Sequence, residues 1–216
     1  MSVEAKICGI TTFEALDAAL AGGADYVGFV FFAKSPRHLE IVRARELAEH
    51  ARGRAKIVAL TVDADDATLQ EIVDEIGPDI LQLHGNERPE RVAEIKRKFG
   101  RTVIKAISVA TADDVNAARD YAGVADLILF DAKPQAEAVL PGGNGRTFDW
   151  SLLSGVSEAV PFMLSGGLKF ENVVEAITLT HPVAVDVSSG VESAPGMKDP
   201  ERILRFLQAA KTATQS

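Results

Sequence analysis

The chain has 216 residues, 47% of them apolar and 25% charged, and a formal net charge of −8. This composition is typical of a globular domain with a sizeable core, and the acidic balance argues against nucleic-acid binding, which relies on basic patches. No apolar run reaches the roughly 18 residues of a membrane helix, and residues 1–11 lack a secretory pattern, so we expect a cytoplasmic protein that does not bind membranes. With a single cysteine, Cys8, an intramolecular disulfide is excluded.

Short apolar runs alternate with amphipathic stretches along the whole chain. The runs predict eight strands, at Ala5–Ile10, Tyr26–Phe32, Lys56–Val62, Ile80–His84, Thr102–Val109, Asp126–Asp131, Pro161–Leu164 and Val183–Val187. The amphipathic stretches predict helices at Phe13–Leu20, Leu39–His50, Ala67–Ile76, Pro89–Phe99, Ala112–Tyr121, Phe170–Leu179 and Pro200–Lys211. After the sixth strand, residues 134–146 are expected to form a loop, and only Phe148–Leu153 is predicted to be helical.

The alternation of strands and helices predicts a parallel sheet covered by helices. Eight such units can close into one (β/α)8 barrel, a TIM barrel, which leaves no sheet edge exposed. We therefore expect residues 1–216 to form a single α/β domain with eight parallel strands. An open doubly wound sheet is the alternative, but the turn after the first strand lacks the Gly-x-Gly-x-x-Gly fingerprint of that fold.

Two clusters of serine and glycine follow the seventh and eighth predicted strands, at the barrel end where active sites lie. The clusters are Ser165, Gly166 and Gly167, and Ser188, Ser189 and Gly190. Barrels often bind phosphate there through backbone amides, and glycine lets the phosphate oxygens approach the backbone closely. Ordinary turn glycines would give the same pattern. However, the two clusters lie in adjacent loops of the expected barrel, which favours a phosphate site and hence a small phosphorylated substrate.

Cys8 and Asp131 are the candidate catalytic residues. Each lies at or near the C-terminal end of an apolar predicted strand, at the active-site end of the barrel. Cys8 is a candidate base because the ordinary pKa of a thiol, about 8.5, is close enough to neutral for some thiolate to form. The alternative is a structural cysteine, since buried cysteines are common in apolar strands. Asp131 has no helix directly after it to cap, and a partly buried carboxyl can act as a general acid.

Three further polar residues at the same end are candidates for substrate binding. Arg37 lies in a Ser-Pro-Arg turn and could meet a carboxylate, although a solvated surface arginine is the ordinary interpretation. His84 and Asp186 lie at or near the ends of their strands. No cysteine–histidine cluster has metal-ligand spacing, so no metal is expected. The pattern leaves open whether Lys6 and Lys105 point into the barrel or outward.

These segments together resemble the phosphoribosylanthranilate isomerase family. The resemblance rests on collinear motifs: Lys6–Thr11, Gly28–Phe31, Lys34–Arg37, Leu81–Gly85, Leu129–Asp131, Phe148–Trp150, Ser165–Leu168, Asp186–Glu192 and Pro195–Asp199. Two positions depart from the family pattern, since Asn144 stands where threonine is frequent and Phe170 where proline is frequent. Both lie away from the candidate acid and base.

The resemblance implies an Amadori rearrangement of N-(5'-phosphoribosyl)anthranilate in tryptophan biosynthesis, with no cofactor. It implies Asp131 as acid, Cys8 as base, Arg37 at the anthranilate carboxylate, Asp186 near the sugar or its nitrogen, and the Ser/Gly clusters at the phosphate. Two alternatives remain: another phosphosugar isomerase of the same fold, and a non-catalytic barrel that binds a phosphometabolite. The first would be expected to carry aspartate in place of Cys8. The oligomeric state, monomer or homodimer, is left open.

Overall fold

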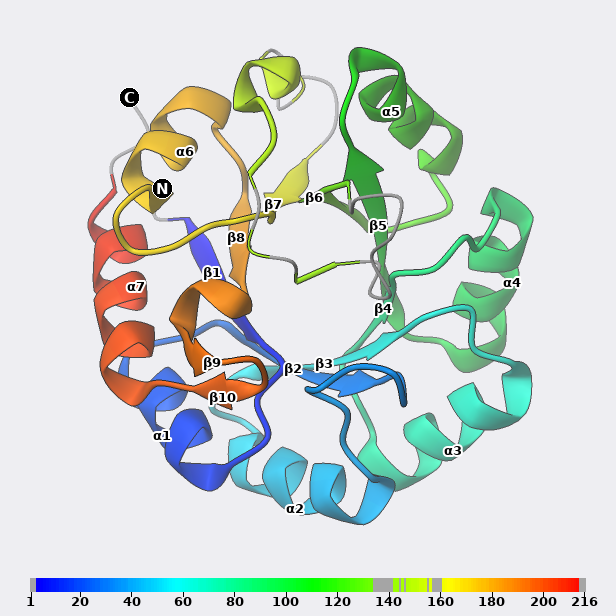
Figure 1. Ribbon diagram of the computed structural model, residues 1–216. Coiled ribbons are helices and arrows are strands. Elements are labelled where there is room, and N and C mark those ends of the chain that lie inside the picture. The colour runs from blue at the N-terminus through cyan, green and yellow to red at the C-terminus, as the bar shows by residue number, and fades with distance from the viewer. Residues whose placement is uncertain are drawn as a thin grey trace.

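Eight parallel strands close into a barrel in the order β1 to β8 (Figure 1). The structure is a computed structural model, and it describes residues 3–133, 142–143, 145, 147–154, 156 and 161–213. The strands are β1 (Glu4–Cys8), β2 (Tyr26–Phe31), β3 (Lys56–Thr61), β4 (Ile80–Leu83), β5 (Thr102–Val109), β6 (Leu127–Ala132), β7 (Phe162–Leu164) and β8 (Ala184–Val187). The predicted eight-stranded (β/α)8 barrel is thus confirmed.

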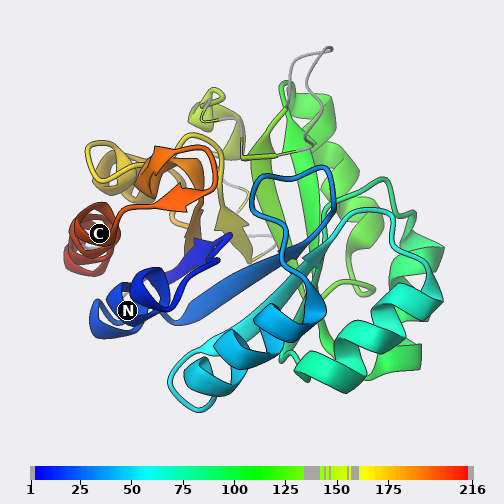
Figure 2. The ribbon, with the colours of Figure 1, turned by 60° about the horizontal axis from the view of Figure 1, so that its bottom comes forward.

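The helices form a ring around the strands (Figures 1 and 2). They are α1 (Phe13–Ala21), α2 (Ile41–Ala51), α3 (Asp66–Ile76), α4 (Pro89–Phe99), α5 (Ala112–Ala117), α6 (Val173–Thr180) and α7 (Pro200–Thr212). Helix α7 packs against α1 and α6 and so completes the ring. A 3-10 turn, η1 (Ala118–Tyr121), extends α5, and another, η2 (Trp150–Leu153), takes the place of a helix between β6 and β7.

Local signals account for most of these helix ends. Thr12, Asp65 and Thr111 cap α1, α3 and α5 by accepting a hydrogen bond from a backbone amide in the first turn. Gly77 ends α3 in the left-handed conformation, with φ +58°. Helix α6 begins at Val173, three residues after the predicted start at Phe170.

The two faces of each strand have different surroundings. One set of buried side chains fills the barrel interior: Tyr26, Val58, Ile80, Ile104, Ala106, Leu129, Met163 and Ala184. The alternate set packs outward against the helices in the larger core. Because side chains alternate along a strand, Lys6 and Cys8 share the inward face of β1, and Lys105 lies on the outward face of β5 beside Val103. The barrel therefore places one buried lysine inside and the other outside.

A small excursion follows β8 that the sequence pattern did not indicate. It consists of the 3-10 turn η3 (Ser189–Val191) and a hairpin of β9 (Glu192–Ala194) and β10 (Met197–Lys198). Gly196, with φ +81°, lets the hairpin approach the loop after β2 closely, since a Cβ there would lie 2.5 Å from the carbonyl oxygen of Pro36. The hairpin thus contacts the segment that carries Arg37.

Among the described residues, no helix combines the length and the apolar character that crossing a membrane requires.

Candidate active site

An open pocket of about 780 Å³ lies at the C-terminal ends of the strands. Its wall includes ten of the eleven predicted site residues: Cys8, Arg37, His84, Asp131, Ser165, Gly166, Gly167, Asp186, Ser188 and Ser189. They come from β1, β6 and β8 and from the loops after β2, β4, β7 and β8. Residues far apart in the sequence therefore meet in one cavity, as expected for a barrel of this class.

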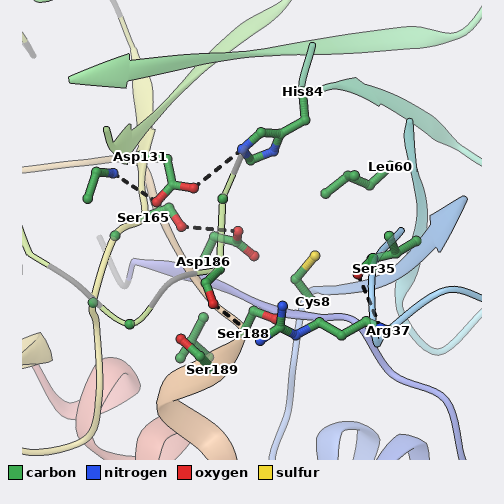
Figure 3. A pocket seen from close by; sticks show the side chains of 18 of the residues that line it. Cys8, Ser35, Arg37, Leu60, His84, Asp131, Ser165, Asp186, Ser188 and Ser189 are labelled. Atoms are coloured by element: carbon green, nitrogen blue, oxygen red, sulfur yellow. Dashed lines mark hydrogen bonds and ion pairs between the residues drawn. The ribbon is translucent and has the colours of Figure 1, made fainter. Parts of the chain in front are cut away.

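Cys8 forms part of the pocket floor with Val30 and Leu60, and its sulfur points into the cavity (Figure 3). Only 4% of the residue is exposed. Burial raises the pKa of the thiol above its ordinary value, and the neighbouring Lys6 ammonium opposes this effect. Cys8 is thus reachable from the pocket while lying in an apolar floor beside a cation.

Asp131 and His84 face each other on another part of the wall (Figure 3). His84 Nε2 lies 3.3 Å from Asp131 Oδ2, and both side chains are less than a tenth exposed. On its other side, His84 Nδ1 lies 3.2 Å from the side-chain nitrogen of Gln82. The other Asp131 oxygen accepts a hydrogen bond from the Ala132 amide at 2.8 Å. The Ala132 hydrogen bond orients the carboxyl group, and His84 lies beside its other oxygen.

Asp186 is anchored between two elements. Lys6 Nζ donates to its Oδ1 at 2.9 Å, and Ser165 Oγ donates to its Oδ2 at 3.4 Å. The parallel register pairs Lys6 directly with Asp186 across β1 and β8. The carboxylate is 4% exposed, and burial of a carboxylate is tolerated when it is paired in this way.

Arg37 is buried, contrary to the ordinary expectation for a turn arginine, and only 5% of it is exposed. Its Nε and Nη2 donate to the two carboxylate oxygens of Glu192 at 2.7 and 2.9 Å. Nη2 also donates to the carbonyl oxygen of Gly143 at 3.3 Å. A bidentate pair of this kind fixes the plane of the guanidinium at the pocket wall.

Glu192 also accepts a hydrogen bond from Lys198 Nζ at 2.6 Å, and Lys198 donates to the carbonyl and hydroxyl oxygens of Ser188. Burial lowers the pKa of Lys198 to about 8, although Glu192 acts in the opposite direction. Burial acts to raise the pKa of Glu192, but the hydrogen bond from Arg37 and the charge of Lys198 outweigh it and hold the pKa below its usual value. Glu192 thereby connects Arg37 to the Ser188 loop.

Glu192 and Lys198 were not among the predicted site residues. They lie 155 and 161 positions after Arg37, so no local spacing connects them with it. The sequence offered only an indirect signal for Glu192, since a buried arginine requires an anion nearby. Its burial could not be foreseen from a Ser-Pro-Arg turn.

The two Ser/Gly clusters lie side by side at the pocket wall. Gly166 and Gly167 have φ values of +90° and +63°, a conformation that glycine adopts without strain. Gly190 is the predicted residue that the pocket wall does not include. A Cβ on Gly190 would lie 1.9 Å from the carbonyl oxygen of Leu168, so this glycine lets the two clusters pack against each other.

Part of the loop after β6 lies over the pocket. Of the predicted loop at 134–146, the structure describes residues 142, 143 and 145, and Asn144 lies outside the described residues. A Cβ on Gly142 would lie 2.4 Å from Asp131 Oδ2 and 2.6 Å from His84 Nε2. Glycine at this position therefore allows the backbone to pass directly over the candidate acid.

Within the part of the chain that the structure describes, no three His, Cys, Asp or Glu residues are grouped as a metal site would require.

Comparisons with known proteins identify the family of this chain. Residues 5–209 match the family described as N-(5'phosphoribosyl)anthranilate (PRA) isomerase. The N-(5'-phosphoribosyl)anthranilate isomerase of Rhodopseudomonas palustris (strain BisA53) is 56% identical over 211 residues, which cover 98% of this chain and 97% of that protein. The enzyme of the same name from Nitrobacter hamburgensis is 56% identical, with 99% and 95% covered.

Solved structures give the same result. The phosphoribosyl anthranilate isomerase from Thermotoga maritima superposes with a TM-score of 0.88 at 37% identity, with 97% of this chain and 98% of that chain covered. A phosphoribosyl anthranilate isomerase in complex with reduced 1-(o-carboxyphenylamino)-1-deoxyribulose 5-phosphate has a TM-score of 0.85 at 35% identity and the same coverage. The chain therefore belongs to the N-(5'-phosphoribosyl)anthranilate isomerase family.

Proposed function

We propose that this chain converts N-(5'-phosphoribosyl)anthranilate to 1-(2-carboxyphenylamino)-1-deoxyribulose 5-phosphate in tryptophan biosynthesis, with Asp131 as acid and Cys8 as base. The observation that carries the proposal is the meeting of Cys8, Asp131, Arg37 and the two Ser/Gly clusters in one pocket of a family member. The substrate supplies its own nitrogen as electron acceptor, so the chemistry requires neither cofactor nor metal.

The acid step opens the furanose ring. Asp131 donates a proton to the ring oxygen while the bond between C1' and that oxygen breaks, and the anthranilate nitrogen supplies the electron pair that forms the iminium. The Ala132 amide orients the carboxyl group for this transfer, with His84 beside it. A positioned acid of this kind contributes to rate by general acid catalysis.

The base step follows at C2'. The iminium acidifies the C2' hydrogen, and the Cys8 thiolate removes it, so that the electrons of the C–H bond form the enolamine. Tautomerisation of the enolamine gives the ketone product. Because a thiolate, and not a thiol, accepts the proton, the surroundings of Cys8 decide how much of the protein is ready to react.

The remaining site residues would bind the substrate. We propose that Arg37, whose plane Glu192 fixes, meets the anthranilate carboxylate, and that the Ser/Gly clusters hold the phosphate. Asp186 and His84 would contact the sugar between these ends. Gly190 would contribute by keeping the two clusters together, since it lies behind the pocket wall.

The proposal extends to the setting of the enzyme. We propose that residues 1–216 form one catalytic domain that acts in the cytoplasm as a monomer or homodimer and does not bind nucleic acid. The acidic net charge of −8 supports the last point.

A direct assay tests the function. Purified protein is incubated with freshly prepared N-(5'-phosphoribosyl)anthranilate, and the loss of anthranilate fluorescence is followed against a sample without protein. We expect enzyme-dependent loss that the Cys8→Ala variant does not give. No loss above the spontaneous rate with folded wild-type protein would overturn the proposal, and equal loss with Cys8→Ala would remove Cys8 from it.

A further inference from the structure

We infer that Lys6 is a positioning residue that favours the anionic form of the Cys8 sulfur against the burial that disfavours it, and that Asp186 holds Lys6 in place for this purpose. The inference rests on the proposed function, in which the Cys8 thiolate acts as the base. It concerns a residue that lies below the pocket and does not belong to its described wall.

Geometry places the Lys6 ammonium beside the Cys8 sulfur. Both residues are on the inward face of β1, two positions apart. On the adjacent strand, Gly28 leaves open the space that both side chains border, since a Cβ there would lie 3.0 Å from Cys8 Sγ and 3.1 Å from Lys6 Nζ. The Cys8 sulfur and the Lys6 ammonium thus border the same small space, where the charge of Lys6 acts on the thiol. Any larger residue at position 28 would separate or displace the two groups.

Lys6 remains charged although it is completely buried, with 0% exposed. Burial alone would lower the pKa of its ammonium. The Asp186 carboxylate, 2.9 Å away, outweighs that effect together with Cys8, and the pKa of Lys6 is raised above its ordinary value. A fixed positive charge therefore lies inside the barrel at neutral pH.

Three charged groups act on Cys8, and Lys6 has the strongest effect among them. Lys6 on β1 favours the thiolate through its charge, and Lys198 on β10 favours it more weakly. Asp186 on β8 disfavours the thiolate directly. Asp186 thus acts in two ways, since it repels the anion but holds the ammonium that stabilises it.

The arrangement suits a base that must be charged before reaction and neutral after it. When the thiolate accepts the C2' proton, Lys6 and Asp186 remain as an electrically balanced pair. The side chains of Val30 and Leu60 in this floor are apolar and offer a thiolate no hydrogen bond. Without Lys6, burial in this floor would favour the neutral thiol still more strongly, and a thiol is not a base.

The single cysteine allows a test that does not depend on turnover. The rate of alkylation of Cys8 by iodoacetamide is measured against pH by intact-protein mass spectrometry, for wild type and for Lys6→Met, which keeps much of the side-chain volume. An opposite charge at close range shifts a pKa by about one unit or more, so we expect alkylation of Lys6→Met at pH 7 to be about tenfold slower or worse. The pH midpoint should move upward to match.

Lys105→Met is the matched control. Lys105 is also a buried strand lysine, but it lies on the outer side of the barrel, where Nζ donates to Glu87 at 2.9 Å and to the carbonyl oxygen of Gly85 at 2.7 Å. Replacing Lys105 removes a buried lysine ammonium, as Lys6→Met does, but outside the barrel and away from Cys8. We expect this variant to keep the wild-type alkylation profile.

Lys6→Met leaves Asp186 without its ammonium. If Lys6→Met does not fold for this reason, the alkylation profile is measured on a second variant, Lys6→Met with Asp186→Asn, which removes both charges. Its midpoint should also lie above that of wild type, because Lys6 outweighs Asp186 at Cys8. An unchanged midpoint in the folded variant would overturn the inference. Failure of wild-type turnover with a shifted midpoint would refute only the proposed function.

Discussion

At the scale of single residues, Asp131 lies in the pocket with the Ala132 amide on one carboxyl oxygen and His84 beside the other. Asp131→Asn keeps the size and much of the hydrogen bonding but cannot supply an acidic proton. General acid groups contribute about 10²–10⁴-fold in rate, so we expect kcat to fall by that factor with little change in product affinity. Steady-state kinetics and calorimetry with product measure both. Turnover near the wild-type rate would exclude Asp131 as the acid.

Arg37 is the residue expected to recognise the aromatic end of the substrate. Arg37→Ala removes the guanidinium that Glu192 orients, so binding of a ligand with the benzoate carboxyl should weaken markedly. A ligand that lacks this carboxyl is the control, and it should bind wild type and variant almost equally. Calorimetry with both ligands gives the comparison. An equal loss for both ligands would show that Arg37 does not meet the carboxylate.

At the scale of elements, Glu192 joins the hairpin of β9 and β10 to the loop after β2. Because Arg37 and Lys198 hold its pKa below the usual value, the carboxylate contributes stability at pH values above its unfolded pKa, and this contribution is lost as pH falls through the lower folded pKa. Glu192→Gln leaves two buried cations without their anion. We expect it to lower the free energy of unfolding at pH 7 by about 3 kcal/mol.

The pH dependence provides the check on Glu192. Denaturant unfolding of wild type and Glu192→Gln at a series of pH values should give a difference that is largest near neutral pH and narrows below about pH 4.5, the usual range for a glutamate. A difference that is constant from pH 3 to pH 7 would mean that the charge of Glu192 does not stabilise the hairpin.

The contact between the loops after β7 and β8 depends on Gly190. A Cβ there would meet the backbone of Leu168, which cannot move as the end of a flexible side chain can, so Gly190→Ala should cost about 1–3 kcal/mol of stability and weaken product binding. Gly53→Ala is the control. Gly53 has φ +75° and open space around it, so its replacement should strain the backbone by about 1 kcal/mol and leave product binding unchanged. Unaltered product affinity in Gly190→Ala would show that the contact between the two loops does not support phosphate binding.

The strand and helix pattern could be predicted because eight strands of this barrel are apolar runs and their helices are amphipathic. The hairpin after β8 could not, since β9 has three residues and β10 two, too few for a periodicity to appear. The segment at Phe148–Leu153 was predicted to be helical, and it forms only the 3-10 turn η2, consistent with a weak helical pattern.

Most of the site was predictable because its residues lie at or just after strand ends. Cys8, Asp131 and the Ser/Gly clusters follow apolar strands, so the barrel fold alone brings them to one end. Partners that closure brings together, such as Lys6 with Asp186 across 180 positions, leave no local signal. The same is true of the direction of Lys6 and Lys105, because a parallel strand buried on both faces has no alternation that distinguishes inside from outside.

At the scale of the whole molecule, an acidic protein presents a pocket suited to an anion. The net charge is −8, yet the pocket combines the Arg37 guanidinium at one place with two glycine-containing loops at another. Backbone amides and one fixed arginine can bind a carboxylate and a phosphate irrespective of the overall charge. Closure of the barrel brings together the loops that carry Arg37 and the two glycine-containing clusters.

The central claim is that Cys8 is the base in this pocket, and alkylation with product protection tests it most directly. Wild-type protein is treated with iodoacetamide, with and without bound product, and mass spectrometry, circular dichroism and turnover are recorded on the same samples. We expect one adduct, complete loss of turnover, a preserved fold and protection by product. Full turnover after stoichiometric alkylation, or unfolding that product does not prevent, would contradict the claim and make Cys8 a core residue.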